Sequence, residues 1–174
     1  THWTFRRTVS VNERICFELD HYDRHRVSQT EAGNNTYVWR VNLLGGGRLL
    51  SISRQLRRMR TLSEYIKDQE KWNYGEGFIV GDKKNLAPFL TGKEYLPTSA
   101  LKENGINESE IKTLTIDRFQ WPRCKQRFTP PLVLIKELES LPIDFWDKGF
   151  ISYRHKIVGI HSPISQKSKL KRLY

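Results

Sequence analysis

The first feature that could do chemistry is a stretch of arginines without acidic neighbours. No Asp or Glu occurs between Glu31 and Glu64. Guanidinium groups bind phosphate oxygens and guanine edges through paired hydrogen bonds, and uncompensated positive charge attracts polyanions. We expect this window to contact nucleic acid, although a solvated helix face is the alternative interpretation. Its arginines are Arg40, Arg48, Arg54, Arg57, Arg58 and Arg60.

Further basic clusters lie in the second half of the chain. No acidic residue follows Asp147, and the tail from 165 onward is rich in lysine. Residues 154–156 (RHK) are expected at a hairpin tip, a shape that can enter a groove or clamp a backbone. We predict phosphate contacts from Arg54, Arg57, Arg58, Lys83, Lys84, Lys167 and Lys169, with Arg60 in the same DNA-binding set. We predict groove or backbone contacts from Arg123, Lys125, Arg127, Arg154 and Lys156.

The composition agrees with a polyanion partner. The 174 residues include 30 Lys+Arg and 19 Asp+Glu, a formal net charge of +11, and nucleic acid is the commonest polyanion that such an excess attracts. Aromatic residues near the basic clusters, such as Trp72, Tyr74 and Trp121, allow base stacking, although core packing explains most aromatics. A basic charge that serves only solubility is the alternative.

Catalytic and metal-binding patterns are weak. His21 and His25 have helical spacing beside Asp20 and Asp23, but a zinc site needs three or four ligands in a recognisable pattern. Cys124 has no evident base partner, and the triple glycine at 45–47 lacks the spacing of a nucleotide-binding loop. The set Asp117, Lys136 and Glu137 does not follow a convincing nuclease order. We therefore expect no catalytic residue and no metal site in this chain.

The elements that must position these residues alternate between sheet and short helices. Val9, Val11, Ile15, Phe17 and Leu19 mark the apolar side of an N-terminal strand or arm. Residue Ser53 is expected to cap a helix over 54–60 whose buried face is Ile52, Leu56 and Met59, and Thr61-x-x-Glu64 to open a helix over 62–71. A short helix is expected from Thr98 to Gly105, and a further one from Ser165 onward. Strands are predicted over 37–44, 114–119, 132–136, 150–153 and 157–161, the last two as a hairpin, and residues 72–81 are predicted to form a strand or a loop.

Six phrases of the sequence, read in order, carry a family resemblance. They are YVWRVNLLGGG (37–47), RTLSEYI (60–66), WNYGEGFIVG (72–81), YLPT (95–98), PLVLIKE (131–137) and FISYRHKIVGI (150–160). In this order they resemble the region that follows the catalytic domain in N6-adenine DNA methyltransferases of restriction–modification systems. The likeness spans most of the chain.

The resemblance implies a target-recognition domain that contacts duplex DNA while a separate catalytic domain transfers methyl from S-adenosylmethionine. The catalytic motif of that family is Asn/Asp-Pro-Pro-Tyr/Phe, whereas this chain has Thr129-Pro130-Pro131-Leu132 and lacks the glycine-rich cofactor loop. We therefore expect no cofactor in this segment and S-adenosylmethionine in the parent enzyme. The expected partners are duplex DNA and the catalytic methyltransferase domain.

The fold class expected from these patterns is α+β, with a mixed or antiparallel sheet and several short helices. Residues 1–174 are expected to form a single domain of a longer, cytoplasmic protein, because no signal peptide or membrane span is visible and the chain starts at Thr1. Three alternatives remain. The chain could be a docking domain using Trp3, Phe5 and Trp146, an RNA-binding module with exposed aromatics, or a small nuclease.

Overall fold

The computed structural model describes residues 2–3, 24–44, 47–138 and 140–174. The fold is α+β, as predicted, with short helices and with antiparallel and mixed sheets. The chain divides into two compact units, residues 1–61 and residues 62–174, which are described separately. A single domain over 1–174 stays a prediction. The N-terminal apolar residues 9–19 and the pair Gly45-Gly46 lie outside the described residues.

The described part of unit 1 is mainly helical. Strands β1 (His2–Trp3) and β2 (Arg24–His25) pair antiparallel, and helices α1 (Gln29–Asn34), α2 (Tyr37–Leu44) and α3 (Gly47–Arg58) follow. The prediction of a strand over 37–44 was wrong. Its Tyr, Val and Trp residues favour strands, but Val38 and Asn42, one helical turn apart, are both buried. Burial of one helical face outweighs a weak local preference.

Helix α3 also differs from its prediction. It begins at Gly47, so Ser53 lies inside the helix and does not cap it. The face expected in the core was wrong as well, because Ile52, Leu56 and Met59 are all exposed whereas Leu50 is buried.

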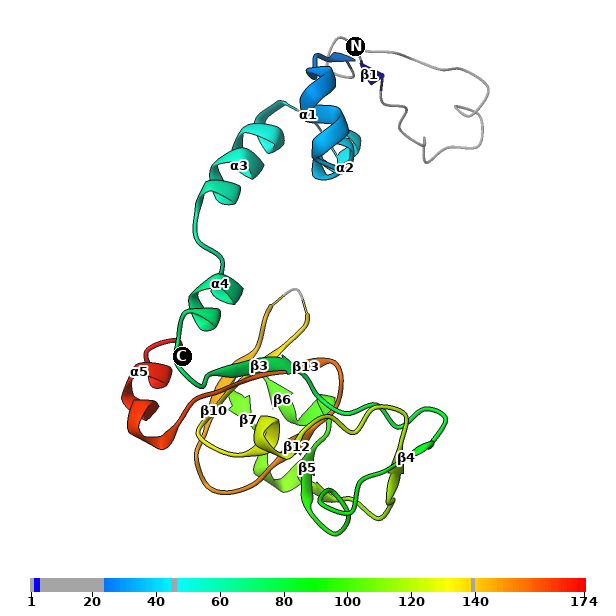
Figure 1. Ribbon diagram of the computed structural model, residues 1–174, viewed down its shortest axis with the longest axis vertical. Coiled ribbons are helices and arrows are strands. Elements are labelled where there is room, and N and C mark those ends of the chain that lie inside the picture. Colours follow the sequence, from blue (N-terminus) through cyan, green and yellow to red (C-terminus); the bar gives the residue numbers. More distant parts are fainter. Residues whose placement is uncertain (1, 4–23, 45–46, 139) are drawn as a thin grey trace. The chain divides into compact units, whose positions relative to one another are not determined.

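Unit 2 is built on a four-stranded antiparallel sheet (Figure 1) in the order β11-β10-β13-β3. Its strands are β3 (Asn73–Glu76), β10 (Leu132–Lys136), β11 (Ile143–Trp146) and β13 (Ile157–His161). The predicted strand LVLIK is confirmed as β10, and β3 occupies part of the segment 72–81, which was predicted as a strand or a loop. Successive side chains of a strand point to opposite faces. Leu132 and Leu134 accordingly join one core, and Val133 joins another.

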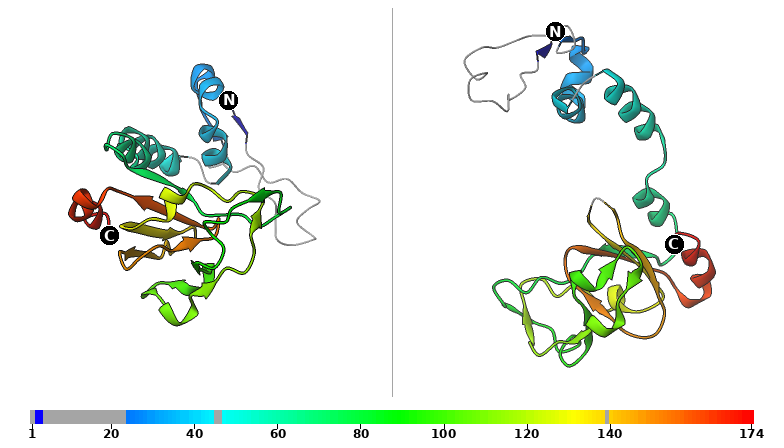
Figure 2. Two further views of the ribbon diagram at one scale, coloured as in Figure 1. Left: turned by 60° about the horizontal axis from the view of Figure 1, so that its bottom comes forward. Right: turned by 180° about the vertical axis from the view of Figure 1, so that it is seen from behind.

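Two short helices close one face of this sheet (Figure 2). Ile66 of α4 (Leu62–Lys67) and Leu170 of α5 (Lys167–Lys171) pack with Val133 and Ile160. The helix predicted over 62–71 is therefore real but shorter, and the tail does form a helix. The opposite face carries the larger core, in which Phe128 and Tyr153 meet edge to face with ring centroids 5.1 Å apart.

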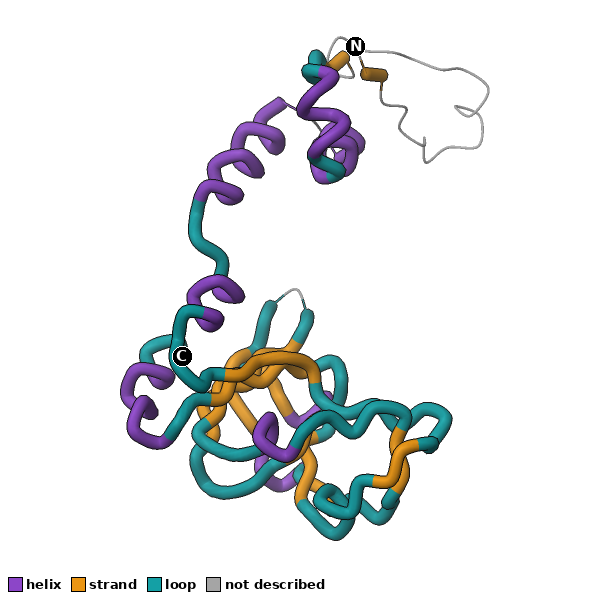
Figure 3. The backbone as a smooth tube through the Cα atoms, in the orientation of Figure 1, coloured by secondary structure: helices purple, strands orange, loops and turns teal. Residues whose placement is uncertain are grey.

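The rest of unit 2 is largely loop with small pairings (Figure 3). Residues 98–105 form a 3-10 turn and the start of a hairpin instead of the predicted helix, and of residues 114–119 only the last two are in a strand. The remaining strands are β4 (Asn85–Leu86), β5 (Glu94–Leu96), β6 (Leu101–Lys102), β7 (Gly105–Ile106), β8 (Lys112–Thr113), β9 (Arg118–Phe119) and β12 (Ser152–Tyr153). The 3-10 helices are η3 (Thr98–Ala100), η4 (Glu108–Glu110), η5 (Lys125–Phe128) and η6 (Ile164–Gln166).

The predicted hairpin over 150–161 was wrong in its pairing. Strand β12 pairs in parallel with β5, while β13 belongs to the four-stranded sheet. The backbone at 77–78 lies between the two segments, since Gly77 N donates to Ile157 O at 3.1 Å and Phe78 N donates to Tyr153 O at 2.9 Å. The turn at 154–156 is retained, with Ile157 N donating to Arg154 O at 2.9 Å.

Candidate nucleic-acid interface

Two arginines of α3 make contacts within unit 1, although both are exposed. Arg54 donates through Nε and Nη2 to both carboxylate oxygens of Glu31 in α1, at 2.9 and 2.6 Å. This contact lowers the pKa of Glu31, mainly through the hydrogen bonds. The Arg57 guanidinium lies 4.2 Å from the ring centroid of Tyr37 in α2. Glu31, the acidic residue just before the acid-free stretch, therefore contacts Arg54. Arg54 links α3 to α1, and Arg57 links α3 to α2.

Two arginines of the 123–127 cluster contact the edge strand of the four-stranded sheet or the residue that follows it. Arg127 donates to the carbonyl oxygens of Tyr74 and Glu76 at 3.3 and 3.2 Å. These carbonyls belong to β3, an edge strand of the four-stranded sheet. Because an open edge can pair with another chain, Arg127 acts as an edge cover. Arg123 donates to Gly77 O at 3.0 Å and contacts the Glu76 carboxylate at 3.3 Å.

The segment 77–85 lies between two further segments that carry cationic side chains. On one side, Ile79 pairs with Trp121, and the Arg123 guanidinium lies 5.3 Å from the centroid of the Trp121 ring. On the other side, Phe78 pairs with Arg154. The segment ends in the exposed turn at Lys83 and Lys84. We define the Trp121 surface as the cationic residues and the exposed tryptophan that these three neighbouring segments carry, namely Lys83, Lys84, Trp121, Arg123, Arg154 and Lys156.

This surface is exposed and mostly uncompensated. Trp121 is 53% exposed, and Arg154 and Lys156 are exposed at their turn. In the described part of the chain, neither Arg154, Lys156 nor Lys83 has a carboxylate within ion-pair distance, while Lys84 lies 3.7 Å from Asp82. Exposed guanidinium and ammonium groups beside an open indole can hold phosphates and stack on a base.

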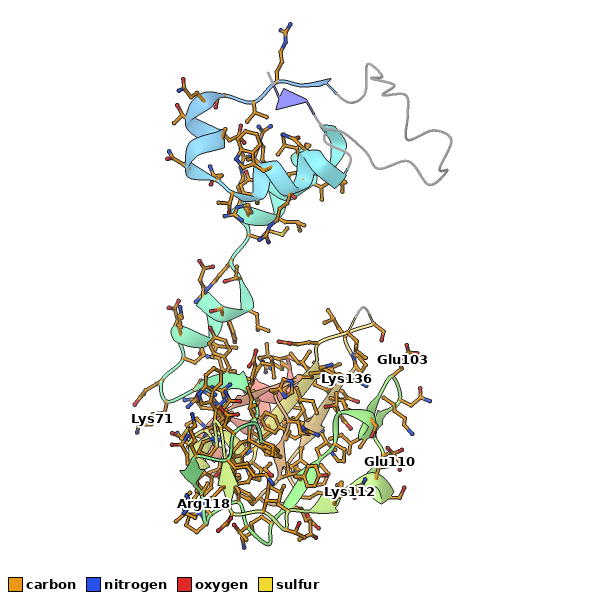
Figure 4. The ribbon with its side chains drawn as sticks, turned by 90° about the vertical axis from the view of Figure 1, so that its right-hand side faces the viewer. Lys71, Glu103, Glu110, Lys112, Arg118 and Lys136 are labelled. Atoms are coloured by element: carbon orange, nitrogen blue, oxygen red, sulfur yellow. The ribbon has the colours of Figure 1, made fainter. Side chains whose placement is uncertain are left out.

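Another group of charged residues in unit 2 lies around η4. Figure 4 places Glu103, Glu110, Lys112 and Lys136 at one side of this unit and Arg118 at the opposite side. The first side includes the β6–β7 hairpin and η4, where Lys102 and Lys148 contact Glu110 and Glu108 at 2.5 Å each. Arg118 lies in β9, just before Trp121. Two carboxylates lie beside the Trp121 surface, Glu76 at Arg123 and Asp82 at Lys84.

Other predicted contact residues belong to other segments of the chain. Lys167 contacts Asp147 at 2.6 Å, and Lys169 donates to Gln69 Oε1 at 2.6 Å. Lys125 is exposed on η5, and Arg58 and Arg60 are exposed at and beyond the end of α3. Sequence reasoning missed the partners of Arg54 and Arg123, because Glu31 and Gly77 are distant along the chain and no local pattern marks them.

Metal-binding side chains are scattered within the described ranges. No group of three or more His, Cys, Asp or Glu side chains there could hold a metal ion. The possible zinc ligands Asp20, His21 and Asp23 lie outside those ranges. Within the same ranges, no helix combines the length and apolar character needed to cross a bilayer.

Comparison of the chain with models of known protein families, with curated proteins and with solved structures gave no match.

Proposed function

We propose that this chain is a DNA-binding target-recognition domain of a restriction–modification N6-adenine DNA methyltransferase, and that the Trp121 surface is its DNA contact. The domain is not catalytic by itself. Methyl transfer from S-adenosylmethionine belongs to a catalytic domain of the same cytoplasmic parent protein. The family resemblance supports the enzyme class, and the surface supports the DNA contact.

The observation that carries the proposal is the convergence of two distant segments on one strand-like stretch. Residues 121–123 and 154–156 flank 77–79 on either side, so the cations Arg123, Arg154 and Lys156 and the exposed Trp121 are carried by segments that share one stretch of backbone. Three segments linked by backbone hydrogen bonds form a fixed platform, and a fixed platform loses little conformational entropy on binding. Phosphate contacts of this kind position a duplex, and base edges supply the specificity.

The test measures binding of the 174-residue chain to random duplex DNA, single-stranded DNA and RNA of matched length, at about 50 mM and about 200 mM salt. We expect duplex DNA to bind most tightly and its affinity to fall steeply with salt. Tighter binding of single strands or RNA would favour an RNA-binding module, and absence of binding to all three at low salt would refute the proposal.

A variant pair locates the contact. The double substitution Arg154→Ala/Lys156→Ala removes two exposed cations, and Lys167→Ala/Lys169→Ala removes two cations that already contact Asp147 and Gln69. The two variants have the same net charge. We expect the first to weaken duplex binding much more than the second, whereas equal losses would mean that only total charge matters.

A further inference from the structure

A pocket of about 590 Å³ lies in unit 2 between the end of α4 and the helix α5. Gln69 and Glu70, which follow α4, line one side of it, and η6 and α5 (red in Figure 1) line the other. We call it the α5 pocket, after the helix that supplies most of its polar side chains. Those side chains are Ser165, Ser168, Lys169 and Arg172.

The spacing of these four residues places them on one side of the η6–α5 segment. Residues three and four positions apart share a helix face, and all four line the pocket. Leu170 lies largely opposite to them and is fully buried against Val133 and Ile160. Because burial of this leucine fixes the rotation of α5, the two hydroxyls and two cations stay on the pocket side.

Two side-chain hydrogen bonds hold the walls of the α5 pocket together. Trp72 Nε1 donates to Gln166 Oε1 at 2.6 Å, and Lys169 Nζ donates to Gln69 Oε1 at 2.6 Å. Gln69 is anchored in turn, since its Nε2 donates to the carbonyl oxygen of Tyr65 at 2.9 Å. A pocket whose walls are fixed in advance loses little conformational entropy when a ligand binds.

The cations of the α5 pocket lack acidic partners. Within the described ranges, neither Lys169 nor Arg172 has a carboxylate within ion-pair distance, and the partner of Lys169 is a neutral amide. Among the described lining residues Glu70 is the one carboxylate, and it lies 3.6 Å from the Lys71 ammonium. Ammonium, guanidinium and hydroxyl groups are all hydrogen-bond donors, so the pocket suits a small anion with several acceptor oxygens.

A phosphate monoester has this chemistry. It carries about two negative charges near pH 7 and three strong acceptor oxygens, which match two cations and two hydroxyl donors. A phosphate of the DNA backbone is a diester with a single charge, so it leaves more of these donors without a partner.

We propose that the α5 pocket binds the phosphate group of a small phosphate monoester. The Lys169 ammonium and the Arg172 guanidinium neutralise its charge, and the hydroxyls of Ser165 and Ser168 donate to its oxygens. This inference is independent of the DNA contact proposed for the Trp121 surface.

The test titrates the 174-residue chain with methyl phosphate, a monoester, and with dimethyl phosphate, the matched diester, and follows the backbone amides by NMR. We expect methyl phosphate to shift the amide signals of 69–70 and 165–172, and dimethyl phosphate to bind at least about tenfold more weakly. Absence of a shift in these segments up to about 10 mM methyl phosphate, or equal binding of the two compounds, would overturn the proposal.

A pair of double variants with the same net charge locates the site. Lys169→Gln/Arg172→Gln removes both pocket cations and should weaken methyl phosphate at least about tenfold. Lys93→Gln/Lys125→Gln removes two exposed cations that do not line the pocket, and it should bind like the wild type. Equal losses in the two variants would mean that net charge alone attracts the anion, and a fall in duplex DNA affinity without a fall in methyl phosphate binding would assign the pocket to nucleic acid. Either result would overturn the proposal.

Two single variants give readouts that do not depend on breaking the bond between Lys169 and Gln69. Arg172 is exposed and its side chain has no hydrogen-bond partner in the described part of the chain, so Arg172→Gln should weaken methyl phosphate while the unfolding curve stays unchanged. Glu70→Gln removes the lining carboxylate and should strengthen binding. Weaker binding by Glu70→Gln, or unchanged binding by Arg172→Gln, would contradict the assigned roles of these charges.

Discussion

The hydroxyl of Tyr153 donates a hydrogen bond to the carbonyl oxygen of Arg127 at 3.1 Å. This bond joins the segment before the basic turn at 154–156 to the 3-10 helix η5 (Lys125–Phe128). Tyr153 is fully buried, and burial raises the pKa of its phenol, so the hydroxyl stays protonated and able to donate. Space for the ring comes from Gly159, where a Cβ would overlap the Tyr153 hydroxyl.

Replacing Tyr153 with Phe removes this donor and leaves the Arg127 carbonyl without it. We expect Tyr153→Phe to lower the free energy of unfolding by about 1–2 kcal/mol, measured by urea denaturation. Tyr174→Phe, at an exposed residue, is the control and should change little. Equal stability of Tyr153→Phe and the wild type would show that the bond does not contribute.

A second prediction concerns the close approach of backbones at Gly77. A Cβ at this position would overlap the carbonyl oxygen of Tyr153 and lie 2.7 Å from that of Arg154. Backbone atoms cannot move aside as a flexible side chain can, so Gly77→Ala should destabilise unit 2 by more than about 2 kcal/mol. Thermal and urea unfolding would measure it.

Gly33 in α1 provides the contrast. A Cβ there meets nothing within 4 Å, and alanine favours a helix over glycine by up to about 1 kcal/mol. Gly33→Ala should therefore stabilise the α1 helix or leave it unchanged, as followed by circular dichroism. A comparable loss of stability in both alanine variants would contradict the assigned role of the Gly77 contact.

The fold class and the central strand could be predicted from the sequence, because LVLIK is a continuous apolar run of strand length. The helix at 37–44 could not, since its side chains favour strands and only tertiary burial of Val38 and Asn42 selects the helix. The pairing of β12 with β5 could not be predicted either. A tight turn at 154–156 suggests a hairpin, and the sequence does not show that the backbone at 77–78 lies between the two segments.

The candidate site was predictable in its charge but not in its geometry. Basic clusters are visible along the chain. Five predicted contact residues and one neighbouring aromatic residue belong to the Trp121 surface. Helical spacing shows that α3 has two faces but not which face packs. Arg54 and Arg57 were therefore assigned to phosphate contacts, and their contacts with Glu31 and Tyr37 were not predicted. The role of Arg127 depends on the carbonyls of β3, which lie more than fifty residues earlier in the sequence.

A third prediction follows from the contact between Arg54 and Glu31. Arg54→Ala should lower the thermal stability of the unit 1 helices because it leaves α1 without its bond to α3. Duplex affinity should fall less for Arg54→Ala than for Arg154→Ala, since the Arg54 guanidinium is already engaged. Circular dichroism and fluorescence anisotropy would measure the two effects. A larger loss of DNA affinity in Arg54→Ala than in Arg154→Ala would indicate that α3 contacts DNA.

The buried imidazole of His161 makes stability depend on pH. Its Nδ1 lies 2.6 Å from Thr129 O, and burial lowers the pKa of His161 against the opposing effect of that bond. A lowered pKa in the folded state means that the unfolded chain binds the proton first, so stability is present above about pH 6.5 and is lost as pH falls. Urea midpoints should therefore drop on acidification.

Two variants assign this pH dependence. His161→Gln should flatten the change in urea midpoint between about pH 7 and 5, whereas His155→Gln, at the basic turn, should retain it. If both variants kept the full pH dependence, His161 would not be its source.

The most direct test of the DNA contact is the salt dependence of duplex binding by the wild type and by Arg154→Ala/Lys156→Ala. If both side chains bind phosphates, the slope of log K against log salt should become less negative by about 0.9 for each phosphate that is no longer neutralised, or about 1.8 in total. Unfolding curves of the two proteins should coincide, since both substituted side chains are exposed. Identical slopes and affinities for the two proteins would contradict the placement of DNA on the Trp121 surface.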